Sequence, residues 1–398
     1  MALLAALLAS AFLATSCSSG GDDGVTGGSD KAVSSSPSPD GPKLTVSPAA
    51  NATEVSPVTP ISLSVDKKTI TAVTVTSSKG DTVEGTIGAD QKSWASKGKL
   101  SFGSSYTVKV TTDGSTTPIT STFTTVPTPS SDTSVRTSSI EGDGKTYGVG
   151  MPIILKLSHS VKGTAARTAF EKMLKVTSDP GTTGAWGWIS STELHFRPSQ
   201  YWAAGSTVHV AVDSAGRSLG GGLWGRSDLT VDFKIGIKRQ LFADASTHQM
   251  KVMESGSNIR TIPVSLGSAK HPSSSGTLIV IDKRPTAMFD SSTYGLPVDA
   301  PGGYRTKVNY AMRLTWDGQF IHDAPWSVEQ QGNSNVSHGC INVGPANSGW
   351  LFNRVQVGDP VVVTNTGTQI PLGDGYSDWS ISFASWLDHS ATGQVTTA

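Results

Sequence analysis

Short strands with alternating apolar and polar side chains recur through most of this chain and restrict it to a mainly β architecture. The first set consists of Ile61–Val65, Ala72–Thr76, Tyr106–Val110 and Thr122–Val126. This alternation is typical of strands that bury one face of a sheet. Runs rich in Ser, Thr and Gly separate the strands, as expected for turns.

The same order of strands occurs a second time. Pro60-Ile61 with Leu63 and Val65 is echoed by Pro152-Ile153 with Leu155 and Leu157, and Thr107–Val110 is echoed by Thr207–Val210. Two repeats of similar length predict tandem β-sandwiches. We place them at residues 43–127 and 128–237, with a linker that begins at Pro127. A short helix is expected in the second repeat, from Ala165 to Leu174.

Residues 238–370 form a third, β-rich domain in this interpretation. Leu314–Ile321 predicts a hairpin, because Asp317-Gly318 suits a two-residue type I′ turn between alternating strands. A helix is expected from Pro345 to Val355, with proline at its start. The C-terminal extension, residues 371–398, is expected to pack on this third domain.

The N-terminus predicts export. Ala2–Ala14 is apolar but too short to span a bilayer, which needs about 20 residues, and suits the core of a signal peptide over residues 1–16. Small residues before Cys17 resemble a bacterial lipobox, which implies lipidation of Cys17 and an anchor on the outer face of the cell membrane. The alternative is an ordinary cleaved signal. No Lys or Arg precedes Lys31, so we expect the natural start to lie upstream. Residues 17–42 are expected to be a flexible tether.

Charge and cysteine content narrow the possible functions. The chain has 31 basic and 31 acidic residues, so it offers no basic surface for nucleic acid. It has two cysteines, and Cys17 lies far from the other in sequence. Cys340 is therefore expected to be a free thiol outside the cytoplasm, where an unpaired cysteine risks oxidation. Such a residue suggests a chemical role.

The residues around Cys340 suit a cysteine nucleophile. His322 comes from a separate strand and can act as base, leaving a thiolate–imidazolium pair, while the nearby His338 is the alternative base. Asp323 could orient the imidazole through its backbone carbonyl or its carboxylate. The amides of Gly339 and Cys340 could face an oxyanion. A buried structural thiol or a metal site of His322, His338 and Cys340 is disfavoured, because zinc-ligand spacings are absent.

His322, a gap of fourteen residues and Ser337-His338-Gly339-Cys340-Ile341-Asn342 resemble the signature of L,D-transpeptidases with a YkuD-type catalytic domain. Further similarity to the actinobacterial lipoprotein branch, which carries two N-terminal Ig-like domains, lies in 290–297, 303–306 and 322–327. The resemblance implies that Cys340 is the nucleophile, His322 the base, and the Asp323 carbonyl the group that holds the imidazole. The substrate-binding or oxyanion positions it implies are Tyr304, Gly318, Trp326, Ser337, His338, Gly339 and Asn342.

The implied reaction is peptidoglycan cross-linking. The enzyme would release D-Ala from a tetrapeptide stem and join its third residue to another stem in a 3→3 link, without metal or organic cofactor. Inhibition by carbapenems and a monomeric state are further expectations. Two departures from the family are Asp323, where serine is frequent, and Phe289, where methionine is common. The alternatives are a hydrolase or D-amino-acid exchanger using the same site, and a wall-binding lipoprotein without catalysis.

Overall fold

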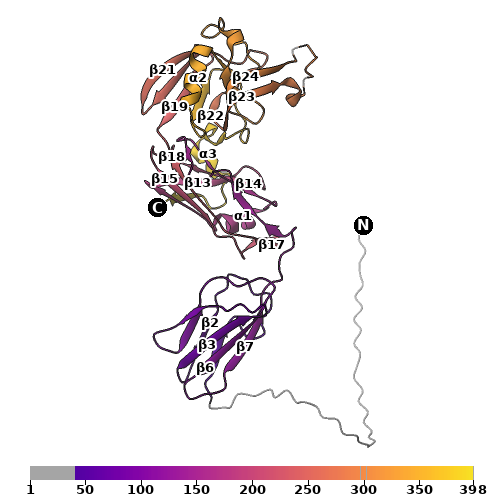
Figure 1. Ribbon diagram of the computed structural model, residues 1–398, viewed down its shortest axis with the longest axis vertical. Helices are drawn as coiled ribbons and strands as arrows, with labels where there is room; N and C mark the ends of the chain where they lie inside the picture. The colour runs from indigo at the N-terminus through magenta and orange to yellow at the C-terminus, as the bar shows by residue number, and fades with distance from the viewer. Residues whose placement is uncertain (1–40, 296, 302, 398) are drawn as a thin grey trace, which may run out of the picture.

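The computed structural model describes residues 41–295, 297–301 and 303–397. These residues form three lobes that follow one another along the chain (Figure 1). The expected signal peptide over residues 1–16 and the lipidation site at Cys17 lie outside the described residues. So does the expected tether, apart from residues 41 and 42. No helix in the described ranges is long and apolar enough to cross a membrane.

The first lobe is a sandwich of two antiparallel sheets. One sheet has the order β1-β2-β5-β4 and the other the order β3-β6-β7. Its strands are β1 Leu44–Ser47, β2 Ser62–Val65, β3 Ile70–Ser77, β4 Gly85–Ile87, β5 Ser93–Ser96, β6 Ser105–Thr112 and β7 Ile119–Thr124. The inward side chains of both sheets, among them Trp94, Tyr106 and Phe123, form one apolar core.

The second lobe repeats this plan. The order β9-β11-β14-β13 corresponds to β1-β2-β5-β4, and β12-β15-β18 corresponds to β3-β6-β7, with antiparallel pairing throughout both sets. Its strands are β8 Ser134–Val135, β9 Thr137–Ser139, β10 Thr146–Tyr147, β11 Ile153–Leu157, β12 Leu174–Asp179, β13 Thr182–Trp188, β14 Glu193–Pro198, β15 Thr207–Val212, β16 Ser218–Gly220, β17 Leu223–Gly225 and β18 Leu229–Ile235. The repeated strand order seen in the sequence therefore corresponds to repeated sheet topology.

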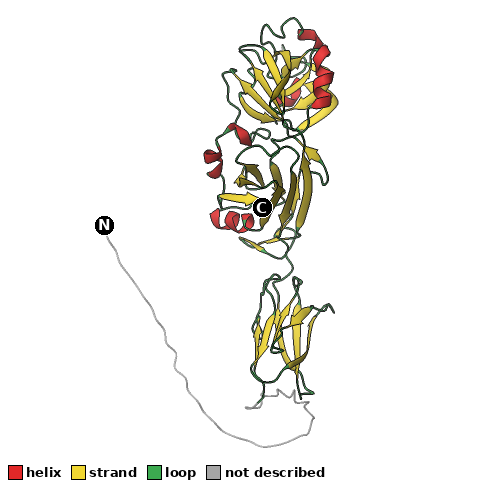
Figure 2. Ribbon diagram, turned by 90° about the vertical axis from the view of Figure 1, so that its left-hand side faces the viewer, coloured by secondary structure: helices red, strands yellow, loops and turns green. Residues whose placement is uncertain are grey.

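A helix distinguishes the second sandwich from the first. Helix α1, Thr164–Glu171, is shorter than the predicted Ala165–Leu174, because Leu174 begins strand β12. Phe170 buries its ring in the sandwich core, and Glu171, the last helical residue, is also buried. In the rotated view the helices beside the second sandwich lie on its left, whereas the long helix of the third lobe lies on the right (Figure 2).

The third lobe is built on a nine-stranded mixed sheet, ordered β22-β27-β19-β20-β21-β26-β25-β24-β23. Its strands are β19 Arg239–Asp244, β20 Gln249–Glu254, β21 Ser257–Ser265, β22 Gly276–Ile279, β23 Asp282–Asp290, β24 Arg305–Arg313, β25 Phe320–Asp323, β26 Ile341–Val343 and β27 Pro360–Thr364. Helix α2, Pro345–Arg354, lies against β24 and β25 and agrees with the predicted helix. The mainly β fold class, with a short helix after the cysteine, is confirmed.

The predicted type I′ turn at Asp317-Gly318 is wrong. β24 and β25 do pair as a hairpin, but the Leu314 N–H bonds to the Gln319 carbonyl at 2.9 Å, which closes a four-residue loop. A type I′ turn needs positive φ at both central residues, and only Gly318 of this dipeptide has it, at 105°. The hairpin was predictable from alternation, whereas the loop conformation depends on tertiary contacts described below.

The predicted packing of residues 371–398 on the third lobe is also wrong for most of the segment. Strand β28, Gln394–Thr397, pairs with β13 and extends a sheet of the second sandwich. Helix α3, Phe383–Leu387, lies on the same strand, where Trp386 is fully buried. Gly187 makes this possible, because a Cβ there would lie 2.5 Å from the Trp386 ring. The C-terminus therefore returns to the second sandwich (Figure 1).

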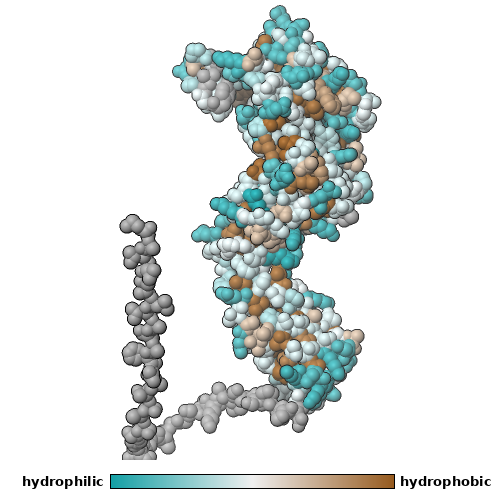
Figure 3. Space-filling view, turned by 180° about the vertical axis from the view of Figure 1, so that it is seen from behind, coloured by the Kyte–Doolittle hydropathy of each residue, from teal (hydrophilic) through white to brown (hydrophobic). Residues whose placement is uncertain are grey.

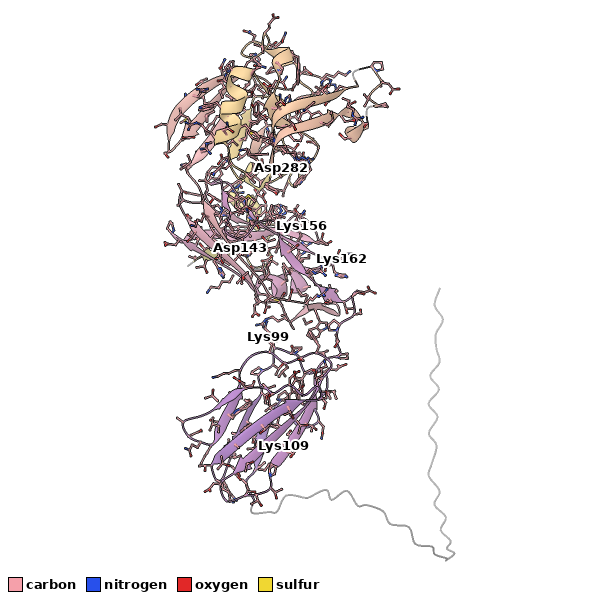
Figure 4. The ribbon with its side chains drawn as sticks, in the orientation of Figure 1. Lys99, Lys109, Asp143, Lys156, Lys162 and Asp282 are labelled. Atoms are coloured by element: carbon pink, nitrogen blue, oxygen red, sulfur yellow. The ribbon has the colours of Figure 1, made fainter. Side chains whose placement is uncertain are left out.

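The two junctions between lobes differ in character. Met151 and Ile154 of the second sandwich share a buried apolar cluster with Ile279, Ile281 and Tyr376. The first and second sandwiches instead meet through exposed or partly exposed contacts. Lys99 Nζ lies 2.6 Å from an Asp213 carboxylate oxygen and 2.9 Å from one of Asp228, and the Phe102 ring meets Trp224 edge-on at a centroid distance of 5.7 Å. Lys99 stands between these two lobes in Figure 4. The face seen in Figure 3 is largely hydrophilic or neutral, with apolar patches along the body.

Candidate active site

The sheet of the third lobe brings His322 and Cys340 together. Strands β25 and β26 are parallel neighbours in which His322 pairs with Asn342, so Cys340, just before β26, lies level with Phe320. Residues two apart on a strand face the same side, and level residues of neighbouring strands share a face. The side chains of His322 and Cys340 therefore project to the same face, from adjacent strands, as predicted for a nucleophile and its base.

The imidazole of His322 is oriented by the backbone. Its Nδ1 lies 2.8 Å from the carbonyl oxygen of Asp323, and the ring is buried. Because a carbonyl only accepts, Nδ1 carries the proton and Nε2 is the basic nitrogen. The Asp323 carboxylate instead accepts a hydrogen bond of 3.0 Å from Ser348 of α2. Of the two predicted orienting groups, the structure therefore supports the carbonyl.

The turn before Cys340 is held by the Ser337 hydroxyl. This hydroxyl donates to the Cys340 carbonyl at 2.6 Å and accepts from the Gly339 N–H at 3.1 Å. Gly339 has φ 119°, a conformation that other residues adopt only with strain. Since the Gly339 amide is engaged by Ser337, its predicted part in an oxyanion hole is not supported.

Burial controls the protonation states of the pair. It raises the pKa of the Cys340 thiol to about 12, with a smaller effect from Asp317 in the same direction. Burial also lowers the pKa of His322, against an opposing effect of its hydrogen bond to Asp323. Both shifts favour neutral groups. The surroundings of both groups therefore oppose formation of the predicted thiolate–imidazolium pair.

A cavity of about 640 Å³ opens onto this pair. Its walls come from the β23–β24 hairpin, the residues after β25 and the turn before β26. The lining residues are Phe289, Tyr304, Thr306, Val308, His322, Trp326, Ser327, Gln330, Val336, Ser337, His338, Cys340 and Asn342. Seven of the predicted site residues therefore line one pocket: Tyr304, His322, Trp326, Ser337, His338, Cys340 and Asn342. Gly318 does not line it, but its carbonyl oxygen lies 3.8 Å from the Cys340 sulfur.

Aromatic rings surround the imidazole and the pocket mouth. Trp326 stacks on His322 with a centroid distance of 5.8 Å, and Phe289 approaches His322 edge-on at 5.0 Å. On the opposite side, His338 stacks on His271 at 4.9 Å and lies 5.6 Å from Tyr304. His338 is exposed, which fits a wall of the pocket better than a buried base.

Several residues that shape the site had no signal in the sequence. The Ser327 hydroxyl accepts from the Asn342 amide at 3.0 Å, and Ser273 donates to the Gly339 carbonyl at 2.7 Å. Gln319 bonds to the Ser274 amide at 2.9 Å. These partners are far apart in the chain and belong to common residue types, so only the fold identifies them. Within the described ranges, no three His, Cys, Asp or Glu side chains gather as metal ligands.

Fold and site together define a β-rich enzyme class with a cysteine nucleophile and a histidine base. Residues 238–363 match the L,D-transpeptidase catalytic domain (YkuD), and residues 52–218, which span both sandwiches, match a bacterial Ig domain. L,D-transpeptidase 2 of Mycobacterium tuberculosis is 35% identical over 346 residues, covering 87% of this chain and 84% of the relative. L,D-transpeptidase 5 of the same species is 31% identical, and the match covers 89% of this chain and 78% of that relative.

Solved structures agree with this relationship. An L,D-transpeptidase in complex with imipenem has a TM-score of 0.51 and 34% identity, covering 58% of this chain and 99% of the other. L,D-transpeptidase 3 of Mycobacterium tuberculosis has a TM-score of 0.50 and 31% identity, and the match covers 59% of this chain and the whole of that chain. The chain belongs to the L,D-transpeptidase family and is an acyltransferase whose substrates are stem peptides of peptidoglycan.

Proposed function

We propose that the protein forms 3→3 cross-links between peptidoglycan stems through a Cys340 acyl-enzyme. The observation that carries this proposal is the orientation of His322. The Asp323 carbonyl fixes the proton on Nδ1, which leaves Nε2 as a base on the face of the sheet that carries Cys340. A pocket of about 640 Å³ gives room for a peptide carbonyl beside the sulfur.

In the acylation step, the Cys340 sulfur attacks the carbonyl of the third residue, a diamino acid, in the donor tetrapeptide. Because the pKa of the thiol is raised, its proton passes to His322 Nε2 as the C–S bond forms. The imidazolium then gives this proton to the departing nitrogen of D-Ala. The products are a thioester on Cys340 and free D-Ala.

In the second step, the side-chain amine of an acceptor stem attacks the thioester. His322 removes a proton from this amine and returns one to the sulfur as the C–S bond breaks. A new amide joins the two stems and the thiol is regenerated. Water in place of the amine gives hydrolysis, and a D-amino acid gives exchange, so the acceptor alone separates these alternatives.

Charge that develops on the substrate oxygen needs a donor in the pocket. Tyr304 lines the cavity from the end of the β23–β24 hairpin and, with the Cys340 amide, is the proposed donor. Trp326 is 56% exposed and forms an apolar wall for the stem. Asn342 and Gly318 border the nucleophile and contact the peptide in this proposal.

Incubation with a disaccharide-tetrapeptide tests the proposal. The expected product is a cross-linked dimer with release of D-Ala, and a tripeptide alone would favour hydrolysis. A carbapenem such as imipenem is expected to form a covalent adduct on Cys340, detected by mass spectrometry of the peptide that carries this residue. Absence of the adduct in the folded protein would count against the nucleophile assignment.

We further propose that the protein is exported and anchored by a lipid on Cys17 at the outer face of the cell membrane. The support is the apolar segment Ala2–Ala14 followed by small residues before Cys17. Metabolic labelling with a fatty acid analogue tests this. Incorporation that disappears in Cys17→Ala is the expected result, and equal labelling of both proteins would contradict it.

A further inference from the structure

One side of the nucleophile is formed by the loop between β24 and β25, residues 314–319. The Gly318 carbonyl lies 3.8 Å from the Cys340 sulfur, and the backbone amide of Phe320, just after the loop, also bonds to this sulfur. Phe320 is held in β25 by its pairing with Arg313, whereas Gly318 belongs to the loop. The position of the loop therefore determines the Gly318 contact, which covers one side of the thiol.

The loop has no regular structure of its own, so side chains hold it. The Thr315 hydroxyl accepts from the Gln319 amide at 3.0 Å, and Arg313 donates to the Thr315 carbonyl at 2.8 Å. These bonds close the loop on itself. At the tip, Trp316-Asp317-Gly318, Arg313 also donates to the Trp316 carbonyl at 2.7 Å, and the Trp316 ring meets Tyr376 edge-on at 5.7 Å. These contacts leave the Trp316 and Asp317 amides to another partner.

The tip is held by a carboxylate from the C-terminal segment. A single oxygen of Asp374 accepts hydrogen bonds from the Trp316 amide at 2.6 Å and from the Asp317 amide at 3.1 Å. The next residue, Gly375, has φ 72°, and a Cβ there would lie 2.4 Å from the Leu314 carbonyl oxygen. The C-terminal segment thus runs directly along the loop.

The same segment is fixed to the second sandwich a few residues later. Asp378 bonds to the buried His195 at 2.7 Å, and Trp379 donates to the Gly150 carbonyl at 2.8 Å. Asp374 is therefore attached to a rigid base on the neighbouring lobe. A carboxylate that accepts two amides from such a base can hold the loop tip in one place.

We propose that Asp374 is a positioning residue for acylation, which holds the Gly318 carbonyl against the Cys340 sulfur by capping the Trp316 and Asp317 amides. The effect on acylation rests on the proposed function, whereas the effect on the thiol's surroundings does not. Asp374 touches no reacting atom and acts through the loop. Displacement of reacting groups by about 1 Å can slow an enzyme by about 100-fold.

Two substitutions separate positioning from a general loss of stability. Asp374→Ala removes the acceptor for both amides. Asp374→Asn keeps an acceptor oxygen in the same place, and its NH₂ group can donate to the Asp317 carboxylate, which interacts with Asp374. Asp90→Ala is the matched control, because Asp90 also caps two amides, of Lys92 and Ser93, but in the first sandwich. Asp374→Ser, too short to reach both amides, replaces Asp374→Ala if that variant does not fold.

The experiment measures two reactions of Cys340 in the full chain, by mass spectrometry of the peptide that carries it. We expect Asp374→Ala to slow acylation by imipenem on the order of tenfold or more. Alkylation by iodoacetamide should become faster, because the sulfur loses its cover. Asp374→Asn should restore both rates toward wild type, and Asp90→Ala should change neither.

Equal acylation and alkylation rates in wild type and Asp374→Ala would overturn the proposal. So would an Asp374→Asn variant as impaired as Asp374→Ala, since the amide cap would then not be the cause. If imipenem fails to acylate the wild type, the proposed function fails at that step. The alkylation rates still decide whether Asp374 holds the loop.

Discussion

The reactivity of Cys340 is set by burial and by one hydrogen bond at the neighbouring histidine. Burial opposes both a resting thiolate and a resting imidazolium, while the Asp323 carbonyl selects the tautomer with a basic Nε2. A raised pKa lowers the fraction of thiolate, which is the form that oxidants attack. Attack on the substrate then needs transfer of the thiol proton to His322.

The lowered pKa of His322 predicts the pH dependence of acylation. The base must be neutral, and a pKa below its ordinary value of 6.5 keeps it neutral into more acidic solution. The rate of acylation by imipenem should therefore fall toward acidic pH with a midpoint below pH 6.5. An acidic limb with its midpoint at or above pH 6.5, measured by stopped-flow fluorescence, would contradict this.

Ser337 gives a second prediction at this scale. Ser337→Ala leaves the Gly339 amide and the Cys340 carbonyl without their partner, which costs about 1–3 kcal/mol for a buried group. We expect a lower Tm and acylation slower on the order of tenfold. Ser337→Thr, which keeps the hydroxyl, is the control. An alanine variant with wild-type Tm and rate would show that the hydroxyl does not hold the turn.

The sequence predicted the reacting residues better than their supports. Cys340 and His322 were identified from a lone thiol and a motif, and the structure brings them to one face. Ser273, Gln319 and Asp374 gave no signal, because each acts through bonds to residues more than 40 positions away. The pKa shifts of the pair also could not be predicted from the sequence, since burial is a property of the fold.

Among the structural elements, the C-terminal segment is the one whose packing partner the sequence pattern did not predict. Its apolar residues indicated that it packs on another lobe, but not that this lobe is the second sandwich. Glu171, at the end of α1, helps to bind the segment there. Its buried carboxylate accepts from the Ala391 and Thr392 amides, both at 2.9 Å, and from the Trp188 indole at 2.8 Å.

Glu171→Ala is expected to loosen this attachment. The amides of Ala391 and Thr392 lose a charged acceptor, and hydrogen bonds of this kind contribute about 1.5–3 kcal/mol each. Hydrogen–deuterium exchange should rise across residues 388–397 and Tm should fall. Glu171→Gln, which retains one acceptor oxygen, should have an exchange rate and a Tm between those of the wild type and Glu171→Ala. Unchanged exchange in Glu171→Ala would show that β28 pairing alone fixes the segment.

His195 predicts how the junction between second sandwich and C-terminal segment depends on pH. Burial lowers its pKa, but Asp378 and Glu193 outweigh this and raise the pKa to about 9. A raised pKa stabilises the fold fully below pH 6.5, and the stabilisation is lost as pH rises through 9.

Thermal unfolding from pH 6 to 9.5 tests this. The Tm of the wild type should fall over the upper half of that range, and His195→Gln should have a lower Tm at pH 6.5 with a flatter profile. Parallel profiles for the two proteins would exclude His195 as the titrating group.

For the whole molecule, the contrast between the two junctions suggests two mechanical units. The second sandwich and the catalytic lobe share an apolar cluster and a C-terminal segment that crosses between them. The first sandwich is joined by a linker, by the ion pairs of Lys99 and by a single edge-on ring contact between Phe102 and Trp224. Repetition in the sequence predicted both sandwiches, but neither junction, because the contacting residues follow no local pattern.

Lys99→Ala should loosen the contact between the first and second sandwiches without lowering the stability of either. Partly exposed ion pairs contribute about 0–1 kcal/mol, so Tm should hardly change. The radius of gyration from small-angle scattering should increase, as should that of the wild type in high salt. Lys109→Ala is the control, because Lys109 is exposed in the first sandwich and lies away from the junction at Lys99 in Figure 4. Identical scattering from both variants would contradict the ionic contact.

The central claim is that Cys340 carries the acyl group during cross-linking, and one product measurement tests it most directly. Wild type and Cys340→Ala are incubated with a disaccharide-tetrapeptide, and the products are identified by mass spectrometry. If Cys340 carries the acyl group, the wild type should give a 3→3 dimer and equimolar D-Ala, and Cys340→Ala folded to the same Tm should give neither. Dimer formed by Cys340→Ala at the wild-type rate would contradict this role of Cys340.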